Sequence, residues 1–437
     1  MTKPSVFPLF LVLIISIPNA TFGTQAGNTT VERLSWEDCI VLARKTNPEL
    51  NSAEINLKAA DYTEKGASST FFPQISSSLN HSYGNSGDSS GIQVSGGSDP
   101  SITTSTSLTA TQNIFNGFQD QAKVNQARAN RQAILSALSI TKAKLSVDLK
   151  AAFAGIQYAQ NSIGLTSDIL KRREANLKLV ELRYTSGREN KGAVLLSKAY
   201  LEQARYELLQ AQNGLTNAQT QMAKVFGREI SEDLYVQGSI PELSAVAPID
   251  FRLLASQTPE FIQAQAHEDL AMAQIEISSS GIYPTLSLSG TTGAVGSVWM
   301  PSTQRWSIGA TLTIPIFNGG KDYYAIKSSA ESARAASLNK DSAFHQSILR
   351  LKQTWSAYLE IIQKLRVDQA FLEALALREK IAKEKYNNGL MSFEDWDLIE
   401  NDLISRQKTT IQSQRDRIIA EATWEQAQGH GVFNEKR

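Results

Sequence analysis

The sequence lacks most of the residues and motifs on which enzymes and metal proteins depend. Of 437 residues, one is cysteine (Cys39) and four are histidine, so an internal disulfide and a cysteine metal site are excluded. His267-Glu268 lacks the second histidine of a zinc helix motif, and the chain has no glycine-rich phosphate loop and no serine or cysteine nucleophile motif. We therefore predict a protein that is not an enzyme and holds no metal or cofactor.

Excess charge and long apolar runs are also missing. The 43 basic residues equal the 43 acidic ones, so there is no basic footprint for nucleic acid. Beyond the N-terminus no stretch approaches eighteen apolar residues, so no transmembrane helix is predicted. At the N-terminus, Lys3, an apolar run over 6–17 and small residues near Ala20 predict a signal peptide over 1–26, cleaved between about 20 and 26. The mature chain is therefore expected to be exported.

Two long helical runs dominate the sequence. The run 118–184 contains no proline and, at ~1.5 Å per residue, would be ~100 Å long. Residues spaced by seven predict its packing seam, namely Leu149, Ile156, Ile163, Leu170, Leu177 and Tyr184. The run 321–389 repeats the spacing, with Leu351, Tyr358, Leu365, Leu372, Glu379 and Tyr386. Each run turns at a glycine and is followed by a predicted return helix.

Four segments alternate with a period of two, which is typical of strands: 73–83, 102–114, 284–292 and 305–315. One face of each is largely apolar, and the other carries mostly Ser, Thr, Asn and Gln. Length and pattern suit tilted strands of an outer-membrane barrel, with lipid outside and water inside; a soluble sandwich would carry Lys and Glu on its outer face. Four strands cannot close a barrel, and lipid does not tolerate open edges. Two, three or four chains would give eight, twelve or sixteen strands.

The plan of the chain occurs twice. Asn47-Pro48-Glu49 returns 211 positions later as Thr258-Pro259-Glu260, and the Ile-Phe-Asn-Gly of 114–117 returns 202 positions later at 316–319. Constant offsets on both sides of the strand pair indicate a duplication with one longer loop. We predict a first repeat over 27–226 with a helical hairpin at 118–226, a linker at 227–250, and a second repeat over 251–437 with a hairpin at 321–429.

This order of motifs, with rod tips Arg183-Tyr184-x-x-Gly187 and Lys385-Tyr386-x-x-Gly389, resembles the TolC-type outer-membrane efflux proteins over essentially the whole mature chain. The resemblance implies a homotrimer whose twelve-stranded transmembrane β-barrel continues into a periplasmic α-helical barrel of coiled-coil hairpins. It also implies a passive exit duct of a tripartite efflux pump or a type I secretion system, carrying small molecules or exported polypeptide. An inner-membrane transporter would supply the energy, and a periplasmic adaptor would dock on the tips.

The same resemblance assigns roles to residues at the tips. Tyr386 and Asp395 match the periplasmic gate, whereas Met391 and Leu398 depart from the family's basic and acidic gate positions. Seven residues of the two turns are candidate adaptor-docking positions: Arg183, Tyr184, Gly187, Arg188, Lys191, Gly389 and Leu390. Two of them, Arg188 and Lys191, belong to the unusually charged first turn and are also candidate gate partners.

Two questions stay open at this level. The acids Glu394, Asp395, Asp397, Glu400 and Asp402 either favour the dipole of a helix start or, at Asp395, form a charged ring in the pore. The helices bundle either as a hollow tube or as a filled coiled coil. The alternative function is an outer-membrane-anchored structural coiled-coil spacer or adhesin without a conducting pore.

Overall fold

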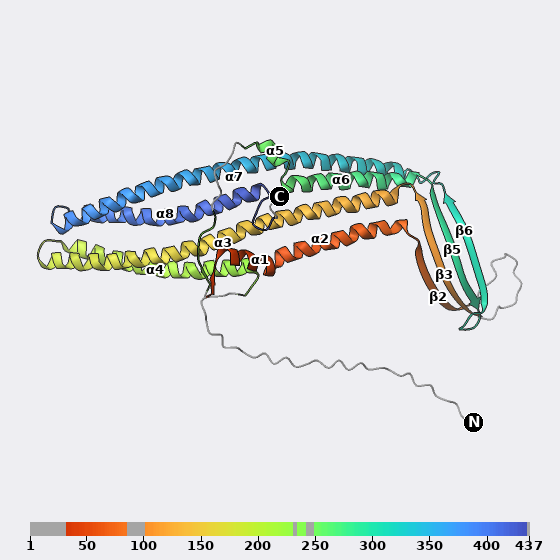
Figure 1. Ribbon diagram of the computed structural model, residues 1–437, viewed down its shortest axis with the longest axis horizontal. Helices are drawn as coiled ribbons and strands as arrows, with labels where there is room; N and C mark the ends of the chain where they lie inside the picture. Colours follow the sequence, from red (N-terminus) through yellow and green to blue (C-terminus); the bar gives the residue numbers. More distant parts are fainter. Residues whose placement is uncertain (1–31, 85–100, 230–233, 242–248, 435–437) are drawn as a thin grey trace, which may run out of the picture.

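The computed structural model describes residues 32–84, 101–229, 234–241 and 249–434. A layer of long helices carries a four-stranded sheet at one end, and two helical turns lie at the opposite end (Figure 1). In the described part of the chain no helix combines the length and apolar character needed to cross a membrane.

The helices fall into two long and several shorter ones. The long helices are α3 (Gln119–Thr185) and α7 (Lys321–Asn387), each of 67 residues and therefore ~100 Å long. The helices that flank them are α2 (Pro48–Ala67), α4 (Lys191–Phe226), α6 (Pro259–Ser279) and α8 (Phe393–Ala427). Smaller elements are α1 (Trp36–Thr46), α5 (Phe251–Ala255) and the 3-10 turns η1 (Ser68–Phe71) and η2 (Ser280–Ile282).

The order of helices across the layer is the same in both halves of the rod. Near the sheet, α3 packs between α2 and α6, and α6 packs on α7; toward the tips, α3 packs between α4 and α8, and α8 packs on α7 (Figure 1). Helix α3 thus packs along four flanking helices, and α1 also contacts it. In the distal half it joins the hairpin α3–α4 to the hairpin α7–α8 through α8.

The flanking helices meet end to end in two pairs, α4 with α2 and α8 with α6, and each junction joins a glycine to a proline. Pro48 begins α2, and Gly227, which has a φ of +66, lies beside it as the C-cap of α4. The side-chain amide of Asn47 donates to the Val225 carbonyl at 2.7 Å. A Cβ on Gly227 would clash with Cδ of Pro48. Gly429, with φ +74, meets Pro259 at the junction of α8 and α6 in the same way. This contact gives a physical reason for the Asn-Pro and Thr-Pro motifs.

The sheet is antiparallel in the order β2-β3-β5-β6, and β2 and β6 have no further partner among the described strands. Its strands are β2 (Gln74–Gly84), β3 (Ser101–Asn116), β5 (Thr285–Gly296) and β6 (Thr303–Thr313). They lie on the four predicted segments, except that β5 runs four residues further than 292 and β6 stops before Pro315.

The register places like side chains on the same face of the sheet. Leu286 pairs with Leu312 on one face, and Ser78 pairs with Ser107 on the other, where their hydroxyls lie 2.8 Å apart. Hydroxyl contacts continue across the sheet with Thr109 and Thr291 at 3.2 Å. The sheet therefore has one apolar face and one hydroxyl-rich face, and both are open to solvent in the single chain.

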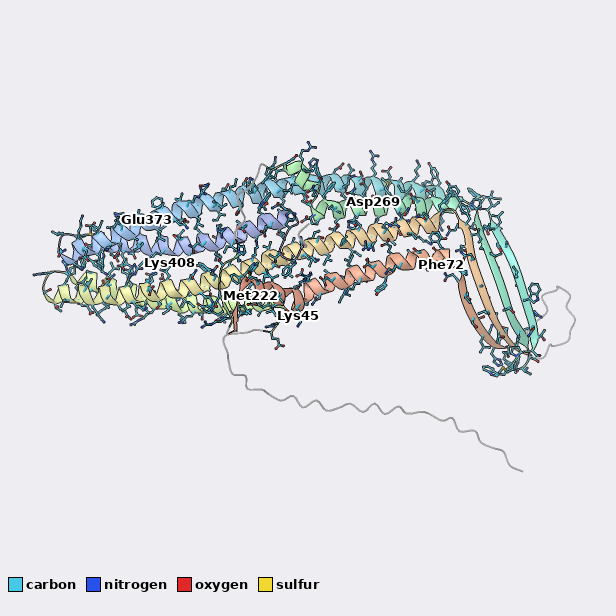
Figure 2. All side chains as sticks on the ribbon, viewed as in Figure 1. Lys45, Phe72, Met222, Asp269, Glu373 and Lys408 are labelled. Carbon is cyan, nitrogen blue, oxygen red and sulfur yellow. The ribbon has the colours of Figure 1, made fainter. Side chains whose placement is uncertain are left out.

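Exposed aromatic side chains mark the boundary between helices and sheet. Phe72 lies where α2 gives way to β2, as Figure 2 shows, and most of its surface is exposed. Across the boundary Phe118 packs edge-on against Phe115 and Tyr283, with ring centroids 5.2 and 6.0 Å apart. Such a girdle suits the interface between lipid and water.

A second, two-stranded sheet lies at mid-length. Strands β1 (Glu32–Leu34) and β4 (Leu234–Val236) pair in parallel beside α1, where Trp36 packs on Phe153 and Cys39 is buried. The region 227–250 was predicted to be a linker, and β4 lies within it. A strand of three residues is too short to produce a periodic signal.

The predicted seam of α3 is correct near mid-length and wrong toward the tip. Leu149 and Ile156 are fully buried, but Tyr184 is 43% exposed, and Arg173 and Asn176 are buried in its place along the helix. A strict seven-residue repeat drifts by ~20° per heptad on a straight helix, so five heptads move the predicted seam by ~100°. The true seam mixes the polar Arg173 and Asn176 with the apolar Ile169 and Val180, and a search for apolar periodicity does not detect such a mixture.

Gly227→Ala should weaken the junction between α2 and α4, because the new methyl group would clash with Pro48 and alanine disfavours a positive φ. We expect a loss of about 1–3 kcal/mol, measured as a lower thermal unfolding midpoint. Gly214→Ala, inside α4 with open space around it, is the control and should leave stability unchanged or raise it by up to ~1 kcal/mol. Equal midpoints for the two variants would contradict the junction.

Candidate functional site at the helical tips

Both helical hairpins turn by the same backbone geometry. Gly187 (φ +72) donates its N–H to the Tyr184 carbonyl at 2.9 Å, and Gly389 (φ +78) donates to the Tyr386 carbonyl at 2.9 Å. The next residues, Arg188 and Leu390, donate back to carbonyls five positions earlier. This is the glycine-terminated Schellman motif, and it requires a residue that tolerates positive φ.

Tyr386 is the centre of the contacts between the two turns. Its side chain is 0% exposed, and its ring stacks on Trp396 at 4.5 Å with 14° between the planes. The guanidinium of Arg183 lies over the Tyr386 ring, 4.3 Å from its centroid, and donates to the Tyr386 backbone carbonyl. The end of α3 is therefore joined to the ends of α7 and α8 by a cation–π contact and an aromatic stack.

The Tyr386 hydroxyl connects to the first turn as well. It donates to Oε2 of Glu189 at 3.1 Å. Burial, and after it the negative charge of Glu189, raise the pKa of Tyr386, so the phenol stays protonated and donates throughout the physiological range. The tip contact therefore consists of a neutral phenol between a cation and a carboxylate.

The other predicted tip residues lie on the surface. Asp395 is exposed in the first turn of α8, where its carboxylate accepts from the Ser392 hydroxyl at 2.8 Å and its N–H donates to that hydroxyl. Asp395 therefore takes part in capping the N-terminus of α8, as the helix-dipole interpretation predicts. A ring of Asp395 side chains in the pore stays a proposal. Arg188 and Lys191 are exposed.

The structure thus brings together Arg183 and Tyr386, to which the resemblance assigned separate roles. It also adds three residues that the sequence analysis did not select: Glu189, Phe393 and Trp396. Trp396 is three positions beyond Phe393 on α8, a helical spacing that places both on one face. That spacing was the available signal for the aromatic pair, but nothing in the sequence pairs them with Arg183.

A buried polar cluster lies on the α3–α8 contact close above the tips. Arg173 of α3 reaches Asp397 at 3.2 Å and Glu400 at 3.1 Å, and its guanidinium lies 4.6 Å from the centroid of the Tyr200 ring on α4. Its members, here called the Arg173 cluster, are Arg173, Asn176, Tyr200, Asp397, Glu400 and Asn401. Two acids of the predicted acidic group are therefore part of a contact between hairpins.

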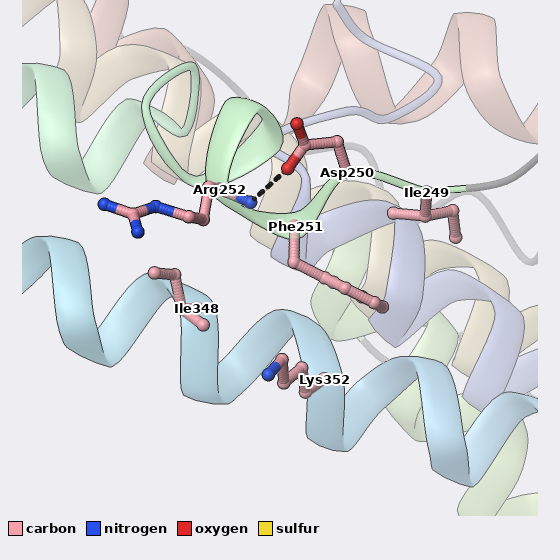
Figure 3. Close-up of a pocket in the computed structure, with 6 residues that line it drawn as sticks. All are labelled: Ile249, Asp250, Phe251, Arg252, Ile348 and Lys352. Carbon is pink, nitrogen blue, oxygen red and sulfur yellow. Dashed lines mark hydrogen bonds between the residues drawn. The ribbon is translucent and has the colours of Figure 1, made fainter.

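Two shallow hollows lie on the outside of the helices. One, of about 360 Å³, lies at the C-terminal end of α7 and the turn that follows, and is lined by Leu377, Lys380, Ile381, Glu384, Lys385, Asn388 and Leu390. Leu390 is 77% exposed at its rim. The other, of about 510 Å³, lies between α5 and α7, where Lys352 approaches the Phe251 ring and Asp250 accepts from the Arg252 N–H at 2.9 Å (Figure 3). In the described residues no three His, Cys, Asp or Glu side chains are grouped to hold a metal ion.

A family model described as outer membrane efflux protein matches this chain at residues 39–228 and 252–430. The chain belongs to this family. Among curated relatives, TolC of Escherichia coli K12 is 26% identical over 332 residues, covering 70% of this chain and 64% of TolC. The match to TolC thus spans less than two thirds of that protein. The outer membrane efflux protein BepC of Brucella suis is 20% identical over 384 residues, covering 87% of this chain and 82% of BepC.

Solved structures of outer-membrane channels share the fold. A membrane protein of Pseudomonas aeruginosa has a TM-score of 0.81 at 17% identity, covering 90% of this chain and 93% of its own. The outer membrane protein VceC of Vibrio cholerae has a TM-score of 0.78 at 18% identity, covering 91% and 96%. This chain therefore has the fold of the family's outer-membrane channels, and the relatives support a general efflux role at the outer membrane.

Arg183→Met should loosen the tip contact, because it removes both the cation over the Tyr386 ring and the donor to the Tyr386 carbonyl. We expect the free energy of local opening to fall by roughly 2 kcal/mol, seen as faster hydrogen exchange of the Gly389 and Leu390 amides. Arg188→Met removes the same charge from an exposed position of the first turn and is the matched control. If both variants exchange like the wild type, the Arg183 contact does not hold the tips.

Proposed function

We propose that this chain is the passive outer-membrane exit duct of a tripartite efflux pump or a type I secretion system, and that it works as a homotrimer. The observation that carries the proposal is the sheet with one apolar and one hydroxyl-rich face, joined to helices ~100 Å long. An apolar face toward lipid and a polar face toward water are what a membrane pore requires. Family membership supports the same role.

Oligomerisation follows from the edges of the sheet. Strands β2 and β6 each leave one edge unpaired among the described strands, and backbone groups left unpaired in lipid cost several kcal/mol each. Pairing β6 of one copy with β2 of the next removes every open edge once the ring closes. Three copies give twelve strands, which is the closure that we propose.

The helices would continue this barrel as a periplasmic tunnel. In each chain the long helices lie side by side in one layer, which fits a wall segment of a tube (Figure 1). The tips would then lie ~100 Å from the membrane, where a periplasmic adaptor could dock on the exposed turn residues. Energy would come from an inner-membrane transporter, because the role proposed for this chain is passive.

The lining suggests a wide range of cargo. Within β2, β3, β5 and β6, Arg305 is the one residue with a permanent charge, and it lies on the hydroxyl-rich face. A lining of hydroxyl and amide groups offers hydrogen bonds to many solutes and selects strongly for none. Small molecules or an exported polypeptide are therefore both suitable cargo, and selection is proposed to occur in the transporter.

The alternative is an outer-membrane-anchored coiled-coil spacer or adhesin without a conducting pore. Long helices alone would serve such a protein equally well. The hydroxyl-rich face of the sheet argues for the duct, because a filled anchor would bury apolar side chains there.

Purified protein in planar bilayers should form discrete conducting channels. If Asp395 rings the tunnel entrance, Asp395→Ala should lower the preference for cations, because it removes one negative charge per chain. The measurement is the reversal potential in a salt gradient at low ionic strength, with Asp402→Asn, exposed on the same helix, as the control. A complete absence of conductance, in the wild type and in Asp395→Ala, would favour the spacer.

A photo-crosslinking residue at Leu390 should capture a periplasmic adaptor in cells, because this side chain is exposed beside the hollow on α7. The same residue at Tyr235, exposed at mid-length, serves as the control and should capture less. Capture is measured as a shifted band identified by mass spectrometry. Crosslinks that contain only this chain at both positions would argue against tip docking.

A further inference from the structure

The Arg173 cluster lies where the two hairpins of one chain meet. Arg173 and Asn176 come from α3, Tyr200 comes from α4, and the carboxylates of Asp397 and Glu400 come from α8. Because α8 begins at Phe393, the two carboxylates lie only ~6–10 Å along the helix from the tip. The cluster is thus placed to control how firmly α8 rests on α3 next to the turn.

The charges inside the cluster do not balance. One guanidinium serves two carboxylates, and all three groups are buried, with Glu400 only 1% exposed. Hydrogen bonds are nearly complete: Arg173 also donates to Asn401, and Asn176 donates to the Oε2 of Glu400 that Arg173 contacts. Among the buried groups one negative charge remains in excess, because Arg172, the next cation on α3, is only partly buried and donates to Gln407. A buried excess charge is costly.

The groups that face Glu400 come from every helix packed around it. Arg172, Arg173 and Asn176 of α3 favour its charged form, whereas Glu379 of α7 and burial itself disfavour it. From α4, Tyr200 faces the neighbouring Asp397 rather than Glu400. Burial is the largest effect, so the pKa of Glu400 is raised above its ordinary value. Taking up one proton would cancel the excess negative charge of the cluster.

We propose that Arg173 is a positioning residue that latches the hairpin α3–α4 to the hairpin α7–α8, and that proton uptake by Glu400 tightens this latch. The inference rests on the proposed function, since the latch would regulate how readily the tunnel tips part. In this scheme the closed tips are favoured in acid and part more readily at neutral pH.

The direction follows from linkage. Glu400 is buried in the latched state and would be hydrated once α8 leaves α3, where its pKa would return toward the ordinary value for glutamate. The latched state therefore binds the proton more tightly than the parted state. Its stability is greatest at low pH and falls as pH rises through the raised pKa. A single proton limits the change to tenfold in the latching equilibrium per pH unit.

Glu400→Gln tests the proposal, because the amide has the shape of the carboxyl group but no charge to titrate. Hydrogen exchange of peptides covering 393–403 is measured on the purified full-length protein from about pH 5 to 7.5, corrected for the intrinsic exchange rate. In the wild type, protection should rise as pH falls, by at most tenfold per unit. In Glu400→Gln it should be high and independent of pH. Asp402→Asn, an exposed acid two positions away, should keep the wild-type slope.

Arg173→Lys supplies a second variant, because lysine keeps the charge but lacks the guanidinium, whose Nη1 contacts both carboxylates while its Nη2 donates to Asn401. It should lower protection of 393–403 at neutral pH by several-fold. A wild type without pH dependence, or a Glu400→Gln variant with the wild-type slope, would overturn the proposal.

Channel recordings separate this proposal from the proposed function. Glu400→Gln should open less often than wild type at neutral pH, and equal opening would refute the regulatory role while leaving the duct intact. If neither the wild type nor any variant conducts, but the protection of 393–403 still depends on pH through Glu400, the proposed duct is refuted and the proposed contact between the hairpins is supported.

Discussion

The packing of α3 against α8 is the contact on which the distal half of the molecule depends. Most of the stability of a helix in a protein comes from tertiary packing. The 67-residue α3 packs on α2 and α6 near the sheet and on α4 and α8 toward the tips. In the distal half, α3 and α8 make the main contact between the two hairpins. Whatever changes this contact changes the relation between the two tips.

Part of the contact between α3 and α8 is formed by buried polar side chains, where most helix pairs have apolar ones such as leucine. Close to the turn, Val180 and Trp396 belong to a small apolar cluster, whereas Arg173 and Glu400 replace such a core one or two helical turns above it. Buried ion pairs repay their desolvation only when their hydrogen bonds are satisfied, and they add less stability than well-packed apolar groups. Their presence at the hairpin contact favours a defined register over maximum strength, which suits the opening that we propose for the tips.

The sequence predicted the elements that repeat over many residues and missed those that depend on single contacts. The alternation near Leu286 placed strands and their faces, because the sheet pattern extends over four segments. The predicted seam failed at Tyr184 because the true seam holds Arg173 and Asn176, which apolar periodicity ignores. At the tips the resemblance pointed to Tyr386, but two of its partners, Arg183 and Glu189, lie about 200 residues away, and one sequence contains no signal that joins them to it.

The two tips share a backbone and differ in what they bury. In the first, Arg183 faces the partner hairpin and Tyr184 faces solvent; in the second, the tyrosine faces inward, so a cation of one tip meets the aromatic ring of the other. Within the described residues, Nε of Arg183 and Nε1 of Trp396 are buried without a hydrogen-bond partner, which costs roughly 1–3 kcal/mol for each. Parting the tips would hydrate both donors and offset some of the lost stacking. The two unpartnered donors therefore reduce the net stability of the contact that joins the tips.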